Sequence, residues 1–299
     1  MKILVTGGTG FIGSNLVRAL VDKGHEIVVV GVQTESSIPG ISKFLNLHFR
    51  GIRWHQIKNI DVAFHLAANN DTQNLDGDEM IEANYSSPVH LFEQLRTSGC
   101  KKIVYASSTA VYGNASPPYR EKTTEIAPLT VYGESKAMFD KYAAQFSELY
   151  GMSVIGLRYC NVYGPREDHK GKRKSMIGQL ISQMMDGHRP KLFKSGEQKR
   201  DWLYVKDAVD ANLKAMETNV SGIFNCASGI ATSFNDLISI INKNLGTNLE
   251  PEYVDNPIKD TYQNHTECDI SMMKNTLGFS PQFDVAKGID DYIEFIKSR

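Results

Sequence analysis

The segment "KILVTGGTGFIG" near the start of the chain constrains the fold more than any other feature. An apolar strand pattern over residues 2–6 leads directly into Gly7, Gly10 and Gly13, where a helix pattern over 11–24 begins. Glycine permits a tight turn and lets a pyrophosphate approach the backbone, while the helix N-terminus offers free N–H groups and a positive dipole end. At a first strand–helix junction, this spacing predicts a dinucleotide-binding unit.

Strand and helix patterns alternate along the first half of the chain. Apolar strand runs follow at 26–30, 61–68, 101–107 and 153–159, helix patterns at about 78–98 and from Tyr132 to Gly151, and one more sheet strand at 222–228. Such alternation is typical of a parallel sheet that is covered on both faces. We therefore expect an α/β fold with a doubly wound parallel (Rossmann) sheet and a smaller C-terminal substrate-binding lobe. The expected dinucleotide-binding domain is 1–165 plus 200–228, and the expected lobe is 166–199 plus 229–299.

Composition narrows the partners and the compartment. The 299 residues include 33 basic and 34 acidic ones, a balance that argues against nucleic acid or a charged membrane surface as the main partner. The four cysteines lie far apart without a CxxC pair, which predicts reduced thiols and no metal site. Neither a signal-peptide core nor an 18-residue apolar run is present, so we expect a cytoplasmic protein.

The identity of the dinucleotide stays open at this stage. An NAD-binding unit usually carries Asp or Glu at the end of its second strand, where it binds the adenosine ribose. Gly31 replaces this acidic ribose ligand, Glu35 lies four residues later, and no Lys or Arg occurs between Gly31 and Lys43. The Ser and Thr hydroxyls in between could bond either a ribose or a 2′-phosphate. The expected cofactor is therefore NAD or NADP.

A candidate catalytic trio lies between residues 107 and 136. "VYGESK" places Tyr132 and Lys136 one helical turn apart on one helix face. A phenol is a useful base near neutral pH only if its phenolate is stabilised, which a neighbouring ammonium achieves. "YASSTAVYG" ends a predicted strand with Ser107 and Ser108, at the carboxyl edge where parallel sheets bind ligands. We predict that one of these serines acts with Tyr132 and Lys136 in catalysis, with Lys136 also bonding the nicotinamide ribose.

With these motifs in this order, the chain resembles the extended short-chain dehydrogenase/reductase family, in its nucleotide-sugar epimerase branch. The likeness extends over nearly the whole chain through "TGGTGFIG", "FHLAA", "YASSTAVYG", "VYGESK", "RYCNVYGP", "KRDWLYVKD" and "CDISMMKNTLGFSP". It implies Ser108, Tyr132 and Lys136 as the catalytic residues. It further implies a nicotinamide cofactor, a nucleotide-diphosphate sugar as substrate, and a homodimer formed through helices near 84–98 and 133–150. The implied cofactor-binding residues are Gly7, Gly10, Phe11, Ile12, Gly13, Leu66, Ala67, Ala68, Tyr132 and Lys136. The resemblance also implies Asn161 near the substrate phosphates and Arg200 against the diphosphate, which a guanidinium can bind in a bidentate manner.

The residues at the end of the Ser108 strand favour one reaction over another. Dehydratases of this branch have Thr-Asp-Glu where this chain has Ser108, Thr109 and Ala110. Without that carboxylate, a 4,6-dehydratase is disfavoured. Epimerases oxidise the sugar transiently to a keto intermediate and return the hydride to the opposite face. The resemblance therefore implies an isomerase that serves carbohydrate biosynthesis.

The loop "NVYGPREDHKGK" (161–172) is similar to one in the ADP-glycero-manno-heptose 6-epimerases, where a lysine works opposite the tyrosine. Lys170 falls on that lysine, and by the same likeness Tyr262 would lie near the substrate. Lys170 could instead contact a phosphate or sugar, or belong to a solvated basic run. A UDP-glucose or UDP-GlcNAc 4-epimerase, which needs only the tyrosine, is the alternative reaction. A catalytically silent NAD(P)-binding sensor or scaffold is the alternative of another class.

Overall fold

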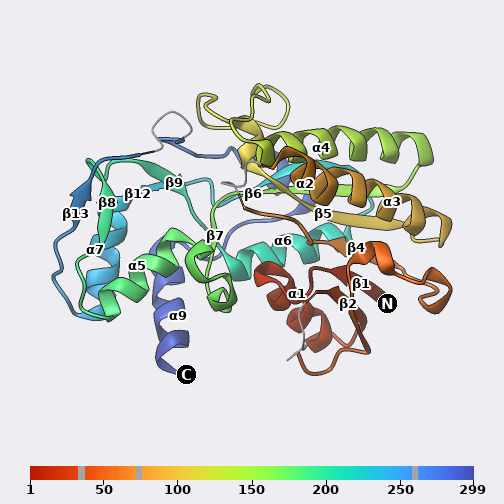
Figure 1. Cartoon of the computed structure of the whole chain (residues 1–299), viewed down its shortest axis with the longest axis horizontal. Coiled ribbons are helices and arrows are strands. Elements are labelled where there is room, and N and C mark those ends of the chain that lie inside the picture. Colours follow the sequence, from red (N-terminus) through yellow and green to blue (C-terminus); the bar gives the residue numbers. More distant parts are fainter. Residues whose placement is uncertain (33–37, 72–75, 258–261) are drawn as a thin grey trace.

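A seven-stranded parallel sheet is the central element of the computed structural model, which describes residues 1–32, 38–71, 76–257 and 262–299. Its strands, in spatial order, are β3 (Lys43–Asn46), β2 (Glu26–Gly31), β1 (Lys2–Thr6), β4 (Val62–His65), β5 (Lys102–Ser108), β6 (Ser153–Tyr159) and β11 (Gly222–Cys226) (Figure 1). The order reverses between β1 and β4, which creates a ligand-binding crevice at the carboxyl ends of the strands. The predicted α/β class with a doubly wound sheet is confirmed.

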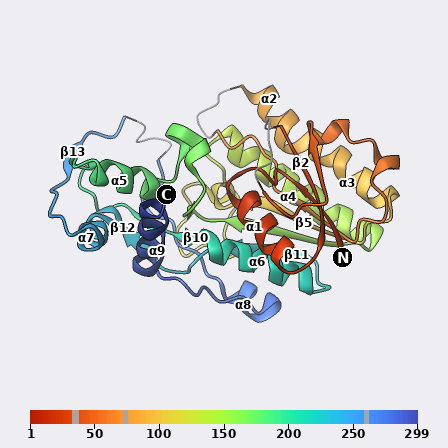
Figure 2. The ribbon, with the colours of Figure 1, turned by 90° about the horizontal axis from the view of Figure 1, so that it is seen from below.

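Helices cover both faces of this sheet (Figures 1 and 2). The first face carries α1 (Phe11–Asp22), α6 (Val205–Glu217) and α8 (Ser271–Leu277), and the second carries α3 (Ser87–Thr97) and α4 (Val131–Tyr150). Leu16 and Val17 of α1 pack with the strands on the first face, and Phe92 and Phe139 do so on the second. Burying each such side chain stabilises the fold by about 1.5–3 kcal/mol, and it holds the crevice rigidly.

Two elements differ from the predicted pattern. Strand β3 was not predicted, because its four residues "KFLN" carry too short an apolar signal to stand out. Together with the short 3-10 turns η1 (Phe49–Gly51) and η2 (Trp54–Gln56), it occupies the connection between β2 and β4. The predicted helix over 78–98 is divided into α2 (Gly77–Ile81), a π-helical turn (Glu82–Ser86) and α3. Such π turns occur often beside functional sites.

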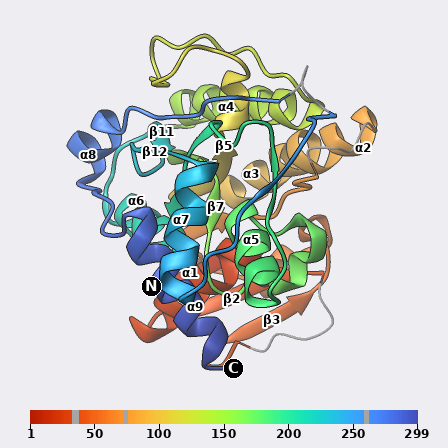
Figure 3. The same ribbon diagram turned by 90° about the vertical axis from the view of Figure 1, so that its left-hand side faces the viewer.

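Other elements lie beside the sheet, and several of them share an apolar cluster of their own. They include the helices α5 (Met176–Met185), α7 (Phe234–Leu245) and α9 (Val285–Lys297). They also include three short strand pairs: β7 (Val162–Tyr163) with β10 (Leu203–Tyr204), β8 (Lys191–Phe193) with β13 (Glu252–Val254), and β9 (Lys199–Asp201) with β12 (Ala231–Ser233). Figure 3 shows α5, α7 and α9 close together on this side of the molecule. The exact boundaries between the two predicted domains stay a prediction. No helix of the described residues is long and apolar enough to cross a membrane.

Candidate functional site

A cavity of about 870 Å³ lies at the carboxyl edge of the sheet. Most of the predicted site residues line it: Gly7, Gly10, Phe11, Ile12, Gly13, Leu66, Ala67, Ala68, Ser108, Tyr132, Lys136, Asn161 and Lys170. They come from the β1–α1 turn, the ends of β4, β5 and β6, the start of α4 and the 3-10 turn η5 (Asp168–Arg173). The fold therefore brings together residues that are up to 163 positions apart in the sequence, from Gly7 to Lys170.

The β1–α1 turn is shaped for a pyrophosphate. Gly7 has a left-handed φ of +70°, and a Cβ there would lie 2.6 Å from the backbone nitrogen of Ala67. A Cβ on Gly13 would overlap the carbonyl oxygen of Gly7. Helix α1 begins after Gly10 without a side-chain cap among the described residues, so its first N–H groups are available to an anion. The residues present thus fit the phosphates of a dinucleotide.

Gly31, which stands where an acidic residue usually binds the adenosine ribose, lies at the other end of the cavity. A Cβ on Gly31 would come within 2.6 Å of the Thr9 hydroxyl oxygen, so a larger residue requires Thr9 to move. Leu47 and His48, which follow the unpredicted strand β3, line this end instead. The Nδ1 atom of His48 accepts a hydrogen bond from the Arg50 backbone N–H, which leaves Nε2 as the protonated nitrogen of a neutral ring. Glu35 lies outside the described residues.

Tyr132 and Lys136 enter the cavity from the first turns of α4. Thr130 caps this helix by accepting a hydrogen bond from the Gly133 backbone N–H at 3.1 Å, which fixes where the helix begins. Lys136 is 5% exposed, its Nζ donates to the Ala106 carbonyl oxygen at 3.0 Å, and it lies 5.9 Å from the centre of the Tyr132 ring. The predicted one-turn spacing therefore does place the ammonium beside the phenol.

The protonation states of the trio follow from burial and neighbouring groups. Burial lowers the pKa of Lys136 to about 8, and the Asp140 carboxylate opposes this effect. Burial raises the pKa of Tyr132, while a hydrogen bond with Ser108 acts in the opposite direction. Lys136 is thus mostly cationic at neutral pH, while Tyr132 is mainly a neutral phenol, whose minor phenolate form is the base that the Lys136 charge favours. His65 bonds Thr6 at 2.7 Å, and burial lowers its pKa to about 3, so its ring is neutral.

Ser107 adds a polar group to which the family resemblance gave no role. Its hydroxyl is buried, lines the cavity, and has no hydrogen-bond partner in the described part of the chain. An unpaired buried hydroxyl costs free energy unless a ligand or water bonds it. Ser107 therefore supports the fit of a polar cofactor or substrate group at the end of β5.

Lys170 reaches the cavity from η5. Its Nζ lies 5.3 Å from the centre of the Phe11 ring at the start of α1. Burial lowers the pKa of Lys170, the negative charge of Glu167 raises it, and Arg173 lowers it. A desolvated ammonium whose pKa is lowered toward neutrality is suited to proton transfer.

Arg200 and Tyr262 lie together, outside the lining of this cavity as the described residues define it. The Arg200 guanidinium stands 4.7 Å over the Tyr262 ring, and the Phe193 ring meets Tyr262 nearly edge-on at 5.4 Å. Asn161, at a left-handed φ of 38°, connects this group to the cavity by donating to the Asp201 carbonyl oxygen at 3.0 Å. The arrangement offers one cation and flat aromatic surfaces next to the cavity.

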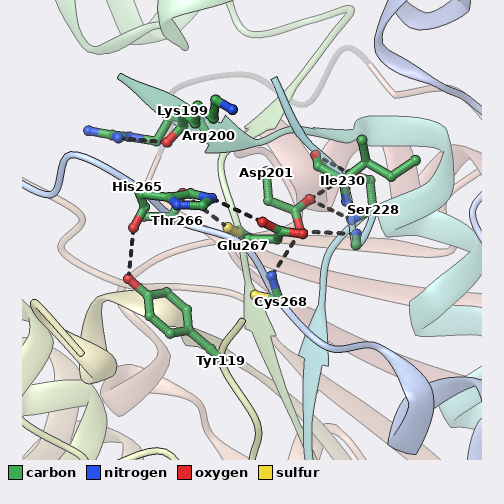
Figure 4. A network of polar contacts seen from close by, with 12 residues as sticks. Tyr119, Lys199, Arg200, Asp201, Ser228, Ile230, His265, Thr266, Glu267 and Cys268 are labelled. Atoms are coloured by element: carbon green, nitrogen blue, oxygen red, sulfur yellow. Dashed lines mark hydrogen bonds and ion pairs between the residues drawn. The ribbon is translucent and has the colours of Figure 1, made fainter. Parts of the chain in front are cut away.

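Asp201 anchors this region from inside (Figure 4). Its buried carboxylate accepts hydrogen bonds from the Ser228 N–H and hydroxyl and from the Gly229 and Cys268 N–H groups, at 2.6–3.2 Å. Burial raises the pKa of Asp201 to about 6. The Asp201 side chain thus connects the strand that carries Arg200 to two other segments of the chain. Nothing in the sequence indicated this role, because the sequence shows only an acidic residue after an arginine.

Several other lining residues had no assigned site role, among them Thr9, Asn69, Asn70, Glu79, His169 and Arg173. Asn69 is held by Asn84 of the π-helical turn, which accepts from its N–H at 2.9 Å and donates to its carbonyl oxygen at 2.8 Å. Only their position just after a predicted strand could have indicated from the sequence that Asn69 and Asn70 line the site.

A doubly wound sheet with a glycine turn at its first strand, and a Tyr–Lys pair at its carboxyl edge, defines a class of enzymes. Members of this class bind a nicotinamide dinucleotide and transfer a hydride and a proton. The chain belongs to the NAD dependent epimerase/dehydratase family, whose model matches residues 3–227. The prediction of a nucleotide-sugar epimerase of the extended short-chain dehydrogenase/reductase family is thereby confirmed.

Solved structures agree with this assignment. The chain is similar to the ADP-L-glycero-D-manno-heptose-6-epimerase of Helicobacter pylori, at 33% identity and a TM-score of 0.89, over 100% of this chain and 96% of that one. It is also similar to the UDP-glucose 4-epimerase of Thermotoga maritima, solved with UDP-glucose, and to the UDP-N-acetylglucosamine 4-epimerase of Methanobrevibacter ruminantium, solved with UDP-N-acetylmuramic acid. Each of these two has 28% identity and a TM-score of 0.91, over 100% of this chain and 99% of the other.

Proposed function

We propose that the chain epimerises a nucleotide-activated sugar with two acid/base groups, Tyr132 and Lys170, in the manner of an ADP-heptose 6-epimerase. The observation that carries the proposal is the place of Lys170, whose ammonium enters the same cavity as Tyr132 from a different element. The similarity to the Helicobacter pylori enzyme supports the same reading.

The roles of the chain's own residues follow from their positions. Tyr132, as a phenolate stabilised by Lys136, takes the proton from the sugar hydroxyl that is oxidised, and Ser108 bonds the same oxygen. The nicotinamide, when bound, supplies reversible hydride transfer. After the keto sugar turns its other face, Lys170 donates the proton that converts the carbonyl oxygen back to a hydroxyl. The hydride returns to the sugar, so the reaction consumes no cofactor, and exchange with solvent removes the proton that Tyr132 gained and replaces the one that Lys170 lost.

The cofactor we propose is NAD. The family model is described as NAD dependent, and MoeE5, a solved structure with 27% identity and a TM-score of 0.89, was solved in complex with UDP-glucuronic acid and NAD. Gly7 to Gly13 would hold the pyrophosphate, Leu66 to Ala68 would border it, and Lys136 would bond the nicotinamide ribose. Mass spectrometry of the dinucleotide that copurifies with the protein would overturn this choice if it found NADP.

The substrate's diphosphate and base are assigned to the group beside the cavity. Arg200 would bind the diphosphate, Asn161 would lie next to it, and Tyr262 would contact the nucleotide. An Arg200→Lys variant keeps the charge but loses the planar fork, so we expect a higher KM for the nucleotide sugar with little change in kcat.

The test separates the two epimerase reactions. The enzyme is incubated separately with the ADP-activated heptose, UDP-glucose and UDP-GlcNAc, and NMR reads the stereochemistry of each product. Inversion at C6 of the heptose supports the proposal, whereas inversion at C4 of a UDP-hexose supports the 4-epimerase reading, which the similarity to two such enzymes favours.

Lys170→Ala tests the two-base mechanism in the same assay. Turnover should fall about 10²–10⁴-fold, as for loss of a general acid or base. Lys191→Ala, at an exposed lysine paired with Glu252, is the matched control. Undiminished turnover in Lys170→Ala would reject the second acid/base group while leaving the family assignment intact.

A further inference from the structure

The loop that carries Lys170 is held by a buried carboxylate at its base. Glu167 is 0% exposed. One carboxylate oxygen accepts the Ser175 backbone N–H at 2.7 Å, and the other accepts the Ser175 hydroxyl at 2.6 Å and the Tyr292 hydroxyl at 3.2 Å. Glu167 and Ser175 flank the loop on either side, so these bonds close it at its base and attach it to α9.

Helix α9 holds the same loop at a second point. Asp168 forms ion pairs with Lys174 at 2.7 Å and with Arg299, which follows α9 at the end of the chain. Arg166 lies 5.1 Å over the Phe295 ring of α9 and donates to the Asn15 side chain of α1 at 3.0 Å. Figure 2 shows the end of α9 next to the segment that follows β7. The base of the loop is thus fixed against both α1 and α9.

The apex of the loop is attached more weakly in the part of the chain that the structure describes, through an Arg173–Asp71 ion pair at 3.8 Å and the Lys170–Phe11 contact. His169, Lys170 and Arg173 line the cavity there. Gly171 has a left-handed φ of 55°, and a Cβ on it would meet no atom of the described residues within 4 Å. The Lys170 backbone N–H bonds the Glu167 carbonyl oxygen at 3.0 Å. The direction of Lys170 therefore depends on how Glu167 is held.

Glu167 acts on Lys170 through its charge as well. Among the described residues, the three donors that bond its carboxylate are neutral groups. The Coulombic effect of Glu167 raises the pKa of Lys170 and opposes the larger effect of burial. A buried carboxylate without a bonded cation keeps a strong field over short distances.

We propose that Glu167, together with Tyr292 and Arg299 at the C-terminal helix, is a positioning clamp that directs Lys170 into the cavity and keeps it charged. The inference rests on the proposed role of Lys170 in the reaction. It assigns no contact with substrate to Glu167, Tyr292 or Arg299. It means that the last helix of the chain, outside the segment that matches the family model, controls the second acid/base group.

The first experiment measures Lys170 itself and needs no substrate. The NAD-saturated protein is labelled with limiting acetic anhydride across a pH series, and mass spectrometry of the peptide that contains Lys170 gives the midpoint of its reactivity. Glu167→Gln keeps the shape of the side chain but removes its charge, so the Lys170 midpoint should move to lower pH. Glu294→Gln, on the exposed side of α9, is the matched control. An unchanged midpoint in Glu167→Gln would overturn the electrostatic part of the proposal.

The second experiment tests the clamp through kinetics. Tyr292→Phe and Arg299→Ala should each lower kcat about 3- to 30-fold with an unchanged KM, because misplacement of a reacting group by less than 1 Å already slows catalysis. Ser298→Ala is the control next to Arg299. If Lys170→Ala lowers turnover but Tyr292→Phe and Arg299→Ala match the unaltered enzyme, the clamp is rejected. If Lys170→Ala has no effect, the proposed two-base function fails instead.

Discussion

The Nζ atom of Lys136 is held between two partners, the Ala106 carbonyl oxygen at 3.0 Å and the Tyr132 ring, whose centre is 5.9 Å away. Strand β5 thus holds the Lys136 ammonium in place, one turn of α4 after the Tyr132 phenol. This geometry fits the proposed acid/base role of the Tyr–Lys pair, because a nearby cation favours the phenolate.

Tyr132→Phe should lower turnover about 10²–10⁴-fold, since the variant lacks the hydroxyl that exchanges the proton. Dinucleotide binding, followed by NADH fluorescence, should persist because the glycine turn is untouched. Tyr253→Phe, at an exposed tyrosine, serves as the control. Loss of turnover with retained binding would also exclude the sensor or scaffold alternative, whereas full turnover would remove Tyr132 from the mechanism.

Turnover should fall as the pH rises above about 8, because Lys136, whose pKa is lowered to about 8, then loses its proton and no longer stabilises the phenolate. Lys136→Arg stays cationic through this range, so its alkaline limb should move to higher pH even if its maximum is lower. The comparison is made in a Lys170→Ala background, where the second lysine does not titrate. If the fall in turnover at high pH occurs at the same pH in both proteins, a group other than Lys136 causes it.

Gly13→Ala should weaken NAD binding by at least tenfold, because the added Cβ overlaps the Gly7 carbonyl oxygen and forces the β1–α1 turn apart. Gly51→Ala is the control, since its nearest neighbour would be Leu47 at 3.8 Å. Isothermal titration calorimetry measures both. Equal affinity in the two variants would show that the turn can relax without loss of the pyrophosphate site.

Asp201→Ala should lower the free energy of unfolding by about 3 kcal/mol or more, because several buried donors lose their acceptor. Denaturant titration measures this, with Asp255→Ala, at a carboxylate that is fully exposed, as the control. The KM for the nucleotide sugar should also rise, since Asp201 follows Arg200 directly. A loss no larger than in the control would show that water replaces the carboxylate.

The chain should form a homodimer through α3 and α4. Leu149 and Tyr150 at the end of α4 are 72% and 40% exposed, and the Arg96 guanidinium of α3 stands 4.3 Å over the Tyr150 ring. Exposed apolar side chains on neighbouring helices favour association. Leu149→Glu should shift the mass measured by light scattering toward the monomer. Ile230→Glu, at an equally exposed residue elsewhere, should leave it unchanged.

Local signals were sufficient for much of the fold. The apolar strands β1, β2, β4, β5, β6 and β11 and the helices α1 and α4 lie where their patterns predicted them, because period and caps are properties of short segments. Strand β3 was missed because a four-residue strand has hardly any period, and so Leu47 and His48, which follow it, were missed as lining residues.

What the sequence determined by itself was the chemistry of short motifs: a glycine turn before a helix, and a phenol one turn from an ammonium. Both depend on spacing within a few residues, so the chain alone sets them. The tertiary structure decided that Lys170 shares a cavity with Tyr132, that Arg200 and Tyr262 lie beside that cavity, and that Glu167 meets Tyr292. These contacts join residues tens to more than a hundred positions apart, and only the packing of helices and strands determines which distant side chains meet.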